Sequence, residues 1–387
     1  MASGTEVQSQ INPLHTVHNS VYTRAAYELE LERIFRRSWI FVCHESEVPE
    51  PGSFVTKQVA GDPILIVRDG AGQVQAFNNV CRHRGSLVAP DAAGSCENFT
   101  CPYHHWTYSL EGDLIGVPGE EAYSGSGFSK EQLGLVPVRC ETVYNLTFVC
   151  LSDSAPPLRD FLGEELLSEM ERPLGRAEYE QFHYESWTLK ANWKVFGENQ
   201  RDGYHVPFVH QSFLAKGSPA QPYRLFPEGH AIQRLRQAQE AVDEKTWAET
   251  NRDLLPGMEP GEGWVVNIFP DFLIMVRNNV SEILSQVNIS HDEVLYEVRL
   301  LGLKGDSEEQ RANRRRSYEV WLQSQQPEDK AIMEIQQRGL QSRGLRTSLI
   351  ARGAEATEGV RGDDNRLRQF WQAWRGMMDL PANSLGS

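Results

Sequence analysis

Two cysteine–histidine pairs, Cys81-Arg-His83 and Cys101-Pro-Tyr-His104, constrain the fold of this chain more than any other feature of its sequence. Both pairs lie in turn-rich segments, because Gly85 follows the first pair and Pro102 interrupts the second. Two such loops, projecting from one sheet, can meet over a single metal centre. Thiolates and neutral imidazoles are donors that bind iron and zinc in proteins. We therefore expect a metal to organise this part of the chain.

The mixed donors of the two loops favour an iron–sulfur cluster over zinc. A zinc ribbon usually offers two Cys-x-x-Cys knuckles, and a zinc finger offers a cysteine pair followed by a histidine pair. Here each loop supplies one cysteine and one histidine, as in a Rieske-type [2Fe–2S] cluster, where two thiolates hold one iron and two imidazoles hold the other. A structural zinc site is the alternative. The predicted cluster ligands are Cys81, His83, Cys101 and His104.

Sequence typical of strands surrounds these loops. Short β-rich runs between Ile40 and Leu151 are separated by turn signals such as Pro51-Gly52. The segment from Ser152 to Pro157 has the composition of an exit linker. We therefore predict an all-β Rieske [2Fe–2S] domain over residues 38–155.

The rest of the chain, residues 1–37 and 156–387, is predicted to form a second, catalytic domain. Long β segments are expected at residues 264–276, 280–289 and 294–303. Helices are expected near residues 23–35, 160–171, 192–204, 307–325, 328–340 and 364–378. Helices that cover a mostly antiparallel sheet indicate an α+β fold. The sequence does not settle which domain the first helix packs against.

A second group of candidate ligands lies in the middle of the chain. Glu198, Asp202 and His205 are spaced i, i+4, i+7, which places them on one face if the segment is a helix. His210 would lie off that face, and we expect Pro207 to bend the helix and bring the two imidazoles together. A polar helix face with two ordinary histidines is the alternative.

Two histidines and one carboxylate are the usual ligands of a non-haem Fe(II) centre that activates O₂. The missing carboxylate is expected from the second half of the chain. The adjacent acids Glu328 and Asp329, at the start of a predicted helix, are the best candidates.

At this point the sequence resembles a known family, the oxygenase α subunits of Rieske non-haem iron aromatic-ring hydroxylases. The motifs that carry the resemblance are C-R-H-R-G, C-P-Y-H-H-W, N-W-K-x-x-x-E-N and D-G-Y-H-x-x-x-x-H. It extends from the early F-R-R-S-W segment to F-W-Q-A-W-R near the C-terminus, and is strongest to the terephthalate-, salicylate- and anthranilate-type oxygenases.

The resemblance implies a role for each matching residue. His205 and His210 match the histidines that bind the mononuclear Fe(II). Asp202 matches the acid that links this site to a Rieske histidine of a neighbouring subunit, and Asn199 matches an asparagine close to the iron. Matching on Gln337 makes Asp329 the carboxylate ligand, whereas matching on Gln336 would make it Glu328; we predict Asp329.

The implied activity is that of a terminal oxygenase component that uses O₂ and electrons from a separate reductase, with or without a ferredoxin, to hydroxylate or dihydroxylate an aromatic substrate. An aromatic acid is the expected substrate, and Arg277, Arg352 and Arg361 are candidates to hold its acidic group. The chain itself has no dinucleotide-binding fingerprint, because Gln75 stands where Gly70-Ala-Gly72 would require a third glycine. The resemblance also implies a homotrimer, α3, or an α3β3 assembly with a small subunit.

Three alternatives stay open at this point. A Rieske monooxygenase or demethylase could act on a quaternary amine or another non-aromatic substrate, although relatives of that kind often carry Glu where this chain has Asp202. A Rieske electron carrier would need only the first domain. A zinc-stabilised protein would have no oxygenase activity.

Charge and composition exclude other functions. The chain has 38 Lys and Arg against 53 Asp and Glu, a formal net charge of −15, which argues against binding to nucleic acid or to an anionic membrane. The first residues, MASGTEVQSQ, have neither the basic start nor the apolar core of an export signal, so we expect a cytoplasmic protein.

Overall fold

The structure, a computed structural model, describes residues 16–123, 127–210, 222–237, 239, 242–323, 326–350 and 364–379. The chain forms two compact units, one of Phe35–Leu158 and one of Met1–Ile34 with Arg159–Ser387. The smaller unit is therefore inserted between two parts of the larger one. Antiparallel sheets dominate both units and helices accompany the larger one, which confirms the predicted α+β class.

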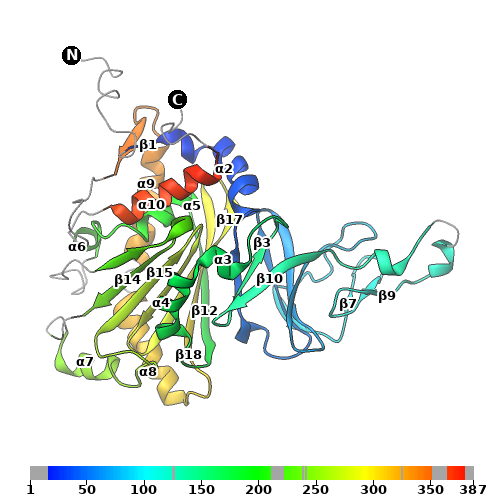
Figure 1. Ribbon diagram of the computed structural model, residues 1–387, viewed down its shortest axis with the longest axis horizontal. Coiled ribbons are helices and arrows are strands. Elements are labelled where there is room, and N and C mark those ends of the chain that lie inside the picture. Colours follow the sequence, from blue (N-terminus) through cyan, green and yellow to red (C-terminus); the bar gives the residue numbers. More distant parts are fainter. Residues whose placement is uncertain are drawn as a thin grey trace. The chain divides into compact units, whose positions relative to one another are not determined.

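The smaller unit is built on a seven-stranded antiparallel sheet of order β2-β11-β10-β5-β4-β3-β6 (Figure 1). Its strands are β2 Ile40–His44, β3 Ser53–Val59, β4 Asp62–Arg68, β5 Val74–Asn78, β6 Ala93–Ser95, β10 Pro137–Val143 and β11 Leu146–Cys150. Residues Ile64 to Val67 of β4 are all buried, as their uninterrupted apolar sequence predicts.

A second, three-stranded sheet of the smaller unit carries the second cysteine–histidine loop. It consists of β7 Phe99–Thr100, β8 Thr107–Tyr108 and β9 Leu114–Gly116. One hydrophobic cluster joins the two sheets, with Leu65 and Phe77 from the large sheet and Phe99 and Tyr108 from the small one. Short 3₁₀ turns are η4 Glu45–Glu47, η5 Glu120–Tyr123 and η6 Lys130–Gln132.

The larger unit is built on a second seven-stranded antiparallel sheet, of order β12-β18-β17-β16-β15-β14-β13 (Figure 1). Its strands are β12 Tyr179–Leu189, β13 Tyr223–Leu225, β14 Ala231–Arg236, β15 Glu262–Ile268, β16 Phe272–Arg277, β17 Val280–Ser290 and β18 Glu293–Leu303. The segment predicted as one β run at residues 264–276 is in fact two strands. Pro270 and Asp271 lie in the connection between β15 and β16, where the chain turns back to form a hairpin.

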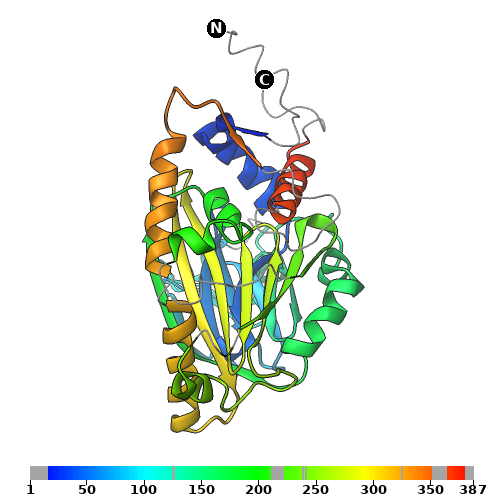
Figure 2. The same cartoon turned by 90° about the vertical axis from the view of Figure 1, so that its left-hand side faces the viewer.

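Helices lie on both faces of this sheet, with α8 and α9 on one side and α4 on the other (Figure 2). The helices are α2 Arg24–Glu30, α3 Leu158–Leu162, α4 Glu164–Leu174, α5 Trp193–Asn199, α6 Val206–Val209, α7 Glu244–Thr250, α8 Glu308–Tyr318, α9 Gln326–Leu340 and α10 Asn365–Met377. Wider π-helical turns, η3 Leu31–Phe35 and η10 Glu319–Gln323, continue α2 and α8. Smaller elements are η2 Asn19–Tyr22, η8 Pro227–Gly229 and the pair β1 Thr16–His18 with β19 Thr347–Leu349.

The first helix packs within the larger unit, which answers the question that the sequence left open. The Glu30 carboxylate, at the end of α2, accepts hydrogen bonds from Trp193 Nε1 at 2.7 Å and Trp374 Nε1 at 2.8 Å. Lys194 Nζ lies 2.6 Å from Glu30 Oε1, and both side chains are fully buried. Because a buried charge is costly unless it is paired, this contact ties α2 firmly to α5 and α10.

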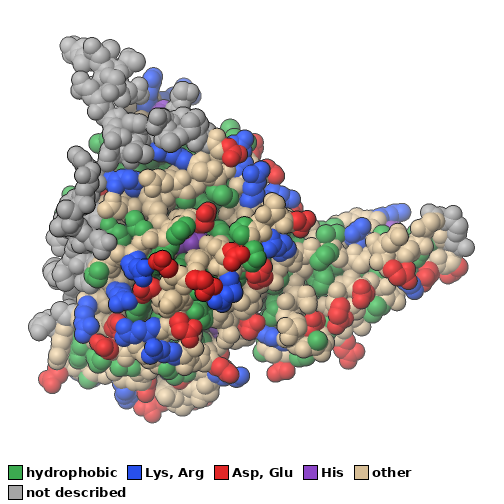
Figure 3. All heavy atoms as spheres, viewed as in Figure 1, with side chains coloured by type: hydrophobic (Ala, Val, Ile, Leu, Met, Phe, Trp, Pro, Cys, Tyr) green, Lys and Arg blue, Asp and Glu red, His purple; other side chains and the backbone are tan. Residues whose placement is uncertain are grey.

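The visible surface of the larger unit mixes acidic and basic side chains, whereas acidic side chains gather along the smaller unit (Figure 3). Among the described residues, none of the helices is both long enough and apolar enough to cross a lipid bilayer.

Candidate metal centres

The two cysteine–histidine loops of the smaller unit share one backbone conformation. In each loop the cysteine N–H donates to a carbonyl five residues later, from Cys81 to Ser86 at 2.8 Å and from Cys101 to Trp106 at 2.9 Å. Each cysteine carbonyl accepts from the residue four positions later, which has positive φ: Gly85 at 74° and His105 at 58°. Glycine adopts this conformation without strain. The repeated turn presents both cysteines and both histidines in equivalent ways.

The four predicted cluster ligands come together at the tips of these loops. The Cys81 and Cys101 side chains are buried, and the His83 and His104 ring centroids lie 4.6 Å apart. Burial raises the pKa of the Cys81 thiol, and the neighbouring Cys101 adds to that rise, so the two cysteine side chains are packed close together. Among the described residues, the buried Nδ1 of His83 has no hydrogen-bond partner. Two adjacent thiols and an unpaired imidazole nitrogen are the donors that a mixed-ligand cluster needs.

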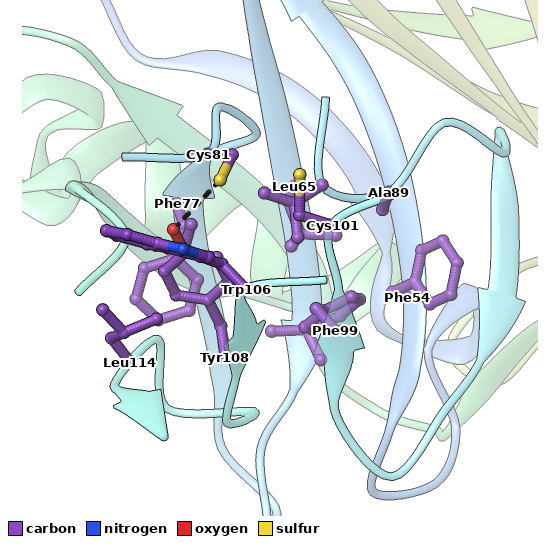
Figure 4. Packing of buried hydrophobic residues seen from close by; sticks show 13 residues of the cluster. Phe54, Leu65, Phe77, Cys81, Ala89, Phe99, Cys101, Trp106, Tyr108 and Leu114 are labelled. Carbon is purple, nitrogen blue, oxygen red and sulfur yellow. Dashed lines mark hydrogen bonds between the residues drawn. The ribbon is translucent and has the colours of Figure 1, made fainter. Parts of the chain in front are cut away.

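Three aromatic residues, Tyr108, Trp106 and Tyr123, contact the predicted cluster ligands. The Tyr108 hydroxyl lies 3.3 Å from Cys81 Sγ and accepts the Arg82 N–H at 3.0 Å. Figure 4 shows this contact and places both sulfur atoms at the same end of the hydrophobic cluster. The His83 ring stacks on Trp106, with an interplanar angle of 5°, and its Nε2 lies 3.3 Å from the Tyr123 hydroxyl. None of these three aromatic residues was predicted as part of the site, although Trp106 is only two residues after His104.

The second candidate site lies in the larger unit, after helix α5. This helix ends at Asn199, earlier than the predicted helix over residues 192–204. The Asp202 side chain accepts the Tyr204 N–H at 2.6 Å and so forms a turn that replaces the next helical turn. Pro207 therefore lies in the first turn of the short helix α6, and the expected bend within one long helix is wrong.

Glu198 does not share a face with the other candidate ligands, which corrects the expected helical spacing. Its carboxylate is buried and accepts hydrogen bonds from Tyr22, Trp371 and Gln336. Burial raises the pKa of Glu198 to about 7, even though these donors and Lys194 lower it. Glu198 therefore joins α5 to η2, α9 and α10 instead of facing the histidines.

His205, His210 and Asp329 do come together, although they flank α6 and begin α9. The Asp329 Oδ1 atom lies 3.4 Å from His205 Nε2 and 3.5 Å from His210 Nε2. One potential ligand atom from each of the three side chains lies within 4.8 Å of the others. Helix α9 contacts both α5 and α6, which keeps the acid opposite the histidines. Two imidazoles and one carboxylate in this arrangement suit a divalent metal such as iron.

The other nitrogen of each imidazole faces a second carboxylate. His205 Nδ1 lies 3.4 Å from Asp202 Oδ2, and His210 Nδ1 lies 3.0 Å from Glu328 Oε2. Glu328 forms a hydrogen bond with His210 Nδ1, and such a bond fixes the ring and its tautomer so that the opposite nitrogen can bind a metal, whereas the buried His205 Nδ1 has no hydrogen-bond partner among the described residues. The two adjacent acids of α9 thus face opposite sides of His210.

These acids also perturb the charge of the site. Burial would lower the pKa of His205, but the neighbouring Asp202 and Asp329 carboxylates raise it to about 9. The pKa of Asp202 is lowered despite its burial, because His205 and the Tyr204 N–H stabilise its charged form. The site therefore favours a positive charge between its acids, which is the electrostatic requirement for holding a cation.

Asn199, the remaining predicted site residue, lies beside this group. Its Nδ2 donates to Asp329 Oδ1 at 3.3 Å, while its Oδ1 accepts from Gln200 at 3.0 Å. Of the three arginine candidates for an acidic substrate, Arg277 ends strand β16, and Arg352 and Arg361 lie outside the described residues.

Family models match both units. Residues 38–137 match the Rieske [2Fe–2S] domain, and residues 176–380 match the catalytic domain of the ring-hydroxylating α subunit. These two matches contain every predicted ligand of the two sites.

Individual relatives match the chain over nearly its whole length. It is 36% identical to the α subunit of 2-aminobenzenesulfonate 2,3-dioxygenase from an Alcaligenes species, over 96% of this chain and 95% of that one. It is 30% identical to an α subunit of the terminal oxygenase component of terephthalate 1,2-dioxygenase from a Comamonas species, over 92% and 93%.

Solved structures show the same fold at lower identity. Naphthalene 1,2-dioxygenase from a Rhodococcus species superposes with a TM-score of 0.81 at 22% identity, covering 94% of each chain. A quaternary ammonium Rieske monooxygenase superposes with a TM-score of 0.79 at 24% identity, covering 94% of this chain and 96% of the other.

Proposed function

The chain belongs to the ring-hydroxylating oxygenase α subunits that carry a Rieske [2Fe–2S] domain, and on that premise we propose that it is the terminal oxygenase component for an aromatic acid. The reaction would add one or two oxygen atoms from O₂ to the aromatic ring. Hydroxylated acids and cis-dihydrodiols are the corresponding products.

The observation that carries this proposal is the position of Asp329 Oδ1 between the Nε2 atoms of His205 and His210. An electron carrier has no need of such a site, and a structural zinc site would normally be closed by a fourth protein ligand. Here three protein donors leave positions for O₂ and for orientation of a substrate. We therefore assign the mononuclear iron to His205, His210 and Asp329, and the cluster to Cys81, His83, Cys101 and His104.

When bound, the cluster supplies single electrons and the ferrous ion supplies the site of O₂ activation. The surrounding residues have positioning roles. Glu328 forms a hydrogen bond with Nδ1 of His210 and Asp202 lies 3.4 Å from Nδ1 of His205, and both Nε2 atoms face Asp329. Asn199 donates to Asp329 and limits the rotation of its carboxylate.

We assign Asp202 a further role, which rests on the family resemblance. Its carboxylate would connect His205 with a Rieske histidine, His83 or His104, of a neighbouring subunit in a homotrimer, α3 or α3β3 with a small subunit. Such an assembly would shorten the electron path between the two metal groups. Electrons would come from a separate reductase, with or without a ferredoxin, since the sequence lacks a dinucleotide-binding fingerprint.

An aromatic acid is favoured as the substrate because two long, full-length matches act on aromatic anions by name, an aminobenzenesulfonate and terephthalate. The likeness to the quaternary ammonium monooxygenase is one of fold at 24% identity and does not favour an amine substrate.

The test is reconstitution of the purified chain with a reductase, NADH, O₂ labelled with oxygen-18 and a panel of benzoates and benzenesulfonates. We expect brown protein that contains acid-labile sulfide and iron, labelled ring-hydroxylated products, and no NADH oxidation by this chain without the reductase. Colourless protein that contains zinc would contradict the proposal. Products formed only from quaternary amines would replace the aromatic acid with the alternative substrate class.

A further inference from the structure

The buried carboxylate of Glu282, in the larger unit, has among the described residues a hydrogen-bond partner for only one of its two oxygens. Glu282, in strand β17, is fully buried, and its Oε1 accepts a hydrogen bond from Gln326 Nε2 at 2.6 Å. Its Oε2 has no hydrogen-bond partner within the described ranges. Among the described residues, no other buried carboxylate oxygen lacks a hydrogen-bond partner. An unpaired buried carboxylate oxygen is unfavourable unless something else binds it.

Arg277 lies beside Glu282 without forming an ion pair with it. Met275 of β16 is opposite Glu282 and Arg277 is opposite Val280, so Arg277 and Glu282 are diagonal neighbours on one face of the sheet. The buried Nε of Arg277 also has no partner in the described part of the chain. Each side chain perturbs the pKa of the other, which shows that the two charges are close.

Two other buried ion pairs of the described residues look different. Lys194 and Glu30 are in contact at 2.6 Å, and Arg314 holds Asp306 through two nitrogens at 2.5 and 2.9 Å. Those pairs satisfy one another and join helices to the rest of the fold. Arg277 and Glu282 are close but keep unpaired atoms, which is the arrangement expected of groups that a ligand completes.

The pair is also connected to the proposed iron site. Gln326, which holds Glu282 Oε1, is three residues before Asp329 on helix α9 and therefore lies near the same side of that helix. The Tyr318 hydroxyl lies 3.1 Å from Gln326 Oε1 and fixes the orientation of that amide. The charges of Glu282 and Asp329 both raise the pKa of the buried Tyr296, in addition to its burial, so both acids are near this ring.

We propose that Arg277 and Glu282 form the substrate-recognition subsite, in which Arg277 binds the acidic group of the ring and Glu282 Oε2 accepts an N–H from an amino group on the neighbouring carbon. This inference rests on the proposed function and narrows its substrate to ortho-amino aromatic acids. The planar guanidinium fork matches two oxygens of a carboxylate or sulfonate. Because acid and amine occupy adjacent ring positions, one ligand can reach both diagonal side chains.

The experiment compares two ligands that differ only in the hydrogen-bond donor, 2-aminobenzoate and 2-methylbenzoate. Their binding to the iron-loaded protein is measured by calorimetry, and their KM and kcat in the reductase-coupled assay. We expect the wild-type protein to prefer the amino compound by roughly tenfold or more, because a site built around a hydrogen bond rejects an analogue that lacks the donor. Glu282→Met, which keeps a similar volume, should abolish the preference, and Glu282→Gln should retain part of it.

Two further variants separate recognition from structure. Arg277→Lys should weaken both ligands by a similar factor and leave their ratio unchanged. Glu297→Gln is the matched control, because Glu297 lies opposite Ser285 on the other face of the sheet and should not alter the ratio. Iron content and the melting temperature report whether each variant is folded.

A preference for the amino compound that survives in folded Glu282→Met would overturn the subsite while leaving the aromatic acid in place. Wild-type protein that holds both metal groups but binds neither acid would contradict the proposed function, and the subsite with it. Equal wild-type affinity for the two ligands would remove the amino group from the proposal and so overturn it.

Discussion

Glu328 Oε2 lies 3.0 Å from Nδ1 of His210, on the side of the imidazole that faces away from Asp329. Glu328 and Asp329, adjacent on helix α9, thus lie beside the two different nitrogens of the His210 imidazole. We assign Asp329 to the metal and Glu328 to the orientation of His210, and mutation can distinguish these two roles.

Asp329→Ala should lose the mononuclear iron and all turnover, whereas Glu328→Ala should keep most of the iron with roughly 10- to 100-fold weaker binding or activity, as is typical for a residue that orients a ligand histidine. Iron analysis, with the visible spectrum as the measure of an intact cluster, checks both variants. Loss of iron from Glu328→Ala alone would exchange the two assignments.

Cys81→Ser should abolish the visible absorbance and EPR signal of the cluster, because it removes one of the four assigned ligands. Cys96→Ser is the control, since Cys96 packs against the same hydrophobic cluster and has no assigned role.

Tyr108→Phe should retain the iron–sulfur cluster but lower its reduction potential, on the order of tens of millivolts, because it removes the hydroxyl beside Cys81 Sγ. An unchanged potential would show that this contact does not reach the cluster ligand.

Asp202→Ala should keep both metal groups and the oligomer, yet slow the passage of electrons to the iron site. Stopped-flow reoxidation of the reduced variant with substrate and O₂ measures this step directly. Reoxidation at the wild-type rate would remove Asp202 from the electron path, and loss of the mononuclear iron would make it a ligand.

Glu282 should make the stability of the protein depend on pH. Burial raises its pKa to about 8 from its usual 4.5, although Arg277 and Gln326 lower it in part. Without a ligand that donates to Oε2, the folded protein therefore holds a proton that the unfolded chain has released, so the stability of the ligand-free protein is lost as the pH rises from about 4.5 towards 8. Glu282→Gln has no such proton, and its melting temperature relative to wild type should increase by several degrees between about pH 5 and 9. A constant difference across this range would mean that Glu282 is ionised throughout.

The cluster loops were predictable because their chemistry lies in consecutive residues: the spacing from Cys81 to His83 and from Cys101 to His104 states the ligand types without a structure. The third acid of the second site was harder. Glu328 and Asp329 differ by one position, and only the packing of α9 against α5 and α6 determines which nitrogen each acid faces.

Other features depend on contacts that a sequence does not display. The expected common face of Glu198 and His205 required a helix that continues past Asn199, but the turn at Asp202 ends it. Glu282 could not be predicted as a site residue, because the sequence of a strand does not show whether an acid within it has a hydrogen-bond or ion-pair partner. Arg277 could be named as a candidate for its chemistry, but the unpaired Oε2 beside it is visible only in three dimensions.

The hydrogen bond between Glu30 and Trp374 joins residues 344 positions apart, across a chain into which the whole smaller unit is inserted. On the ribosome, residues 35–158 are all synthesised long before the larger unit can close, because Glu30 must wait for Lys194 and then for Trp374 to emerge. Domains generally fold as units as synthesis proceeds, so the cluster-binding loops can assemble early, while helix α5 and the ligands that follow it acquire their final support last. The residues of the cluster-binding loops can therefore be in place before the residues around the second site are.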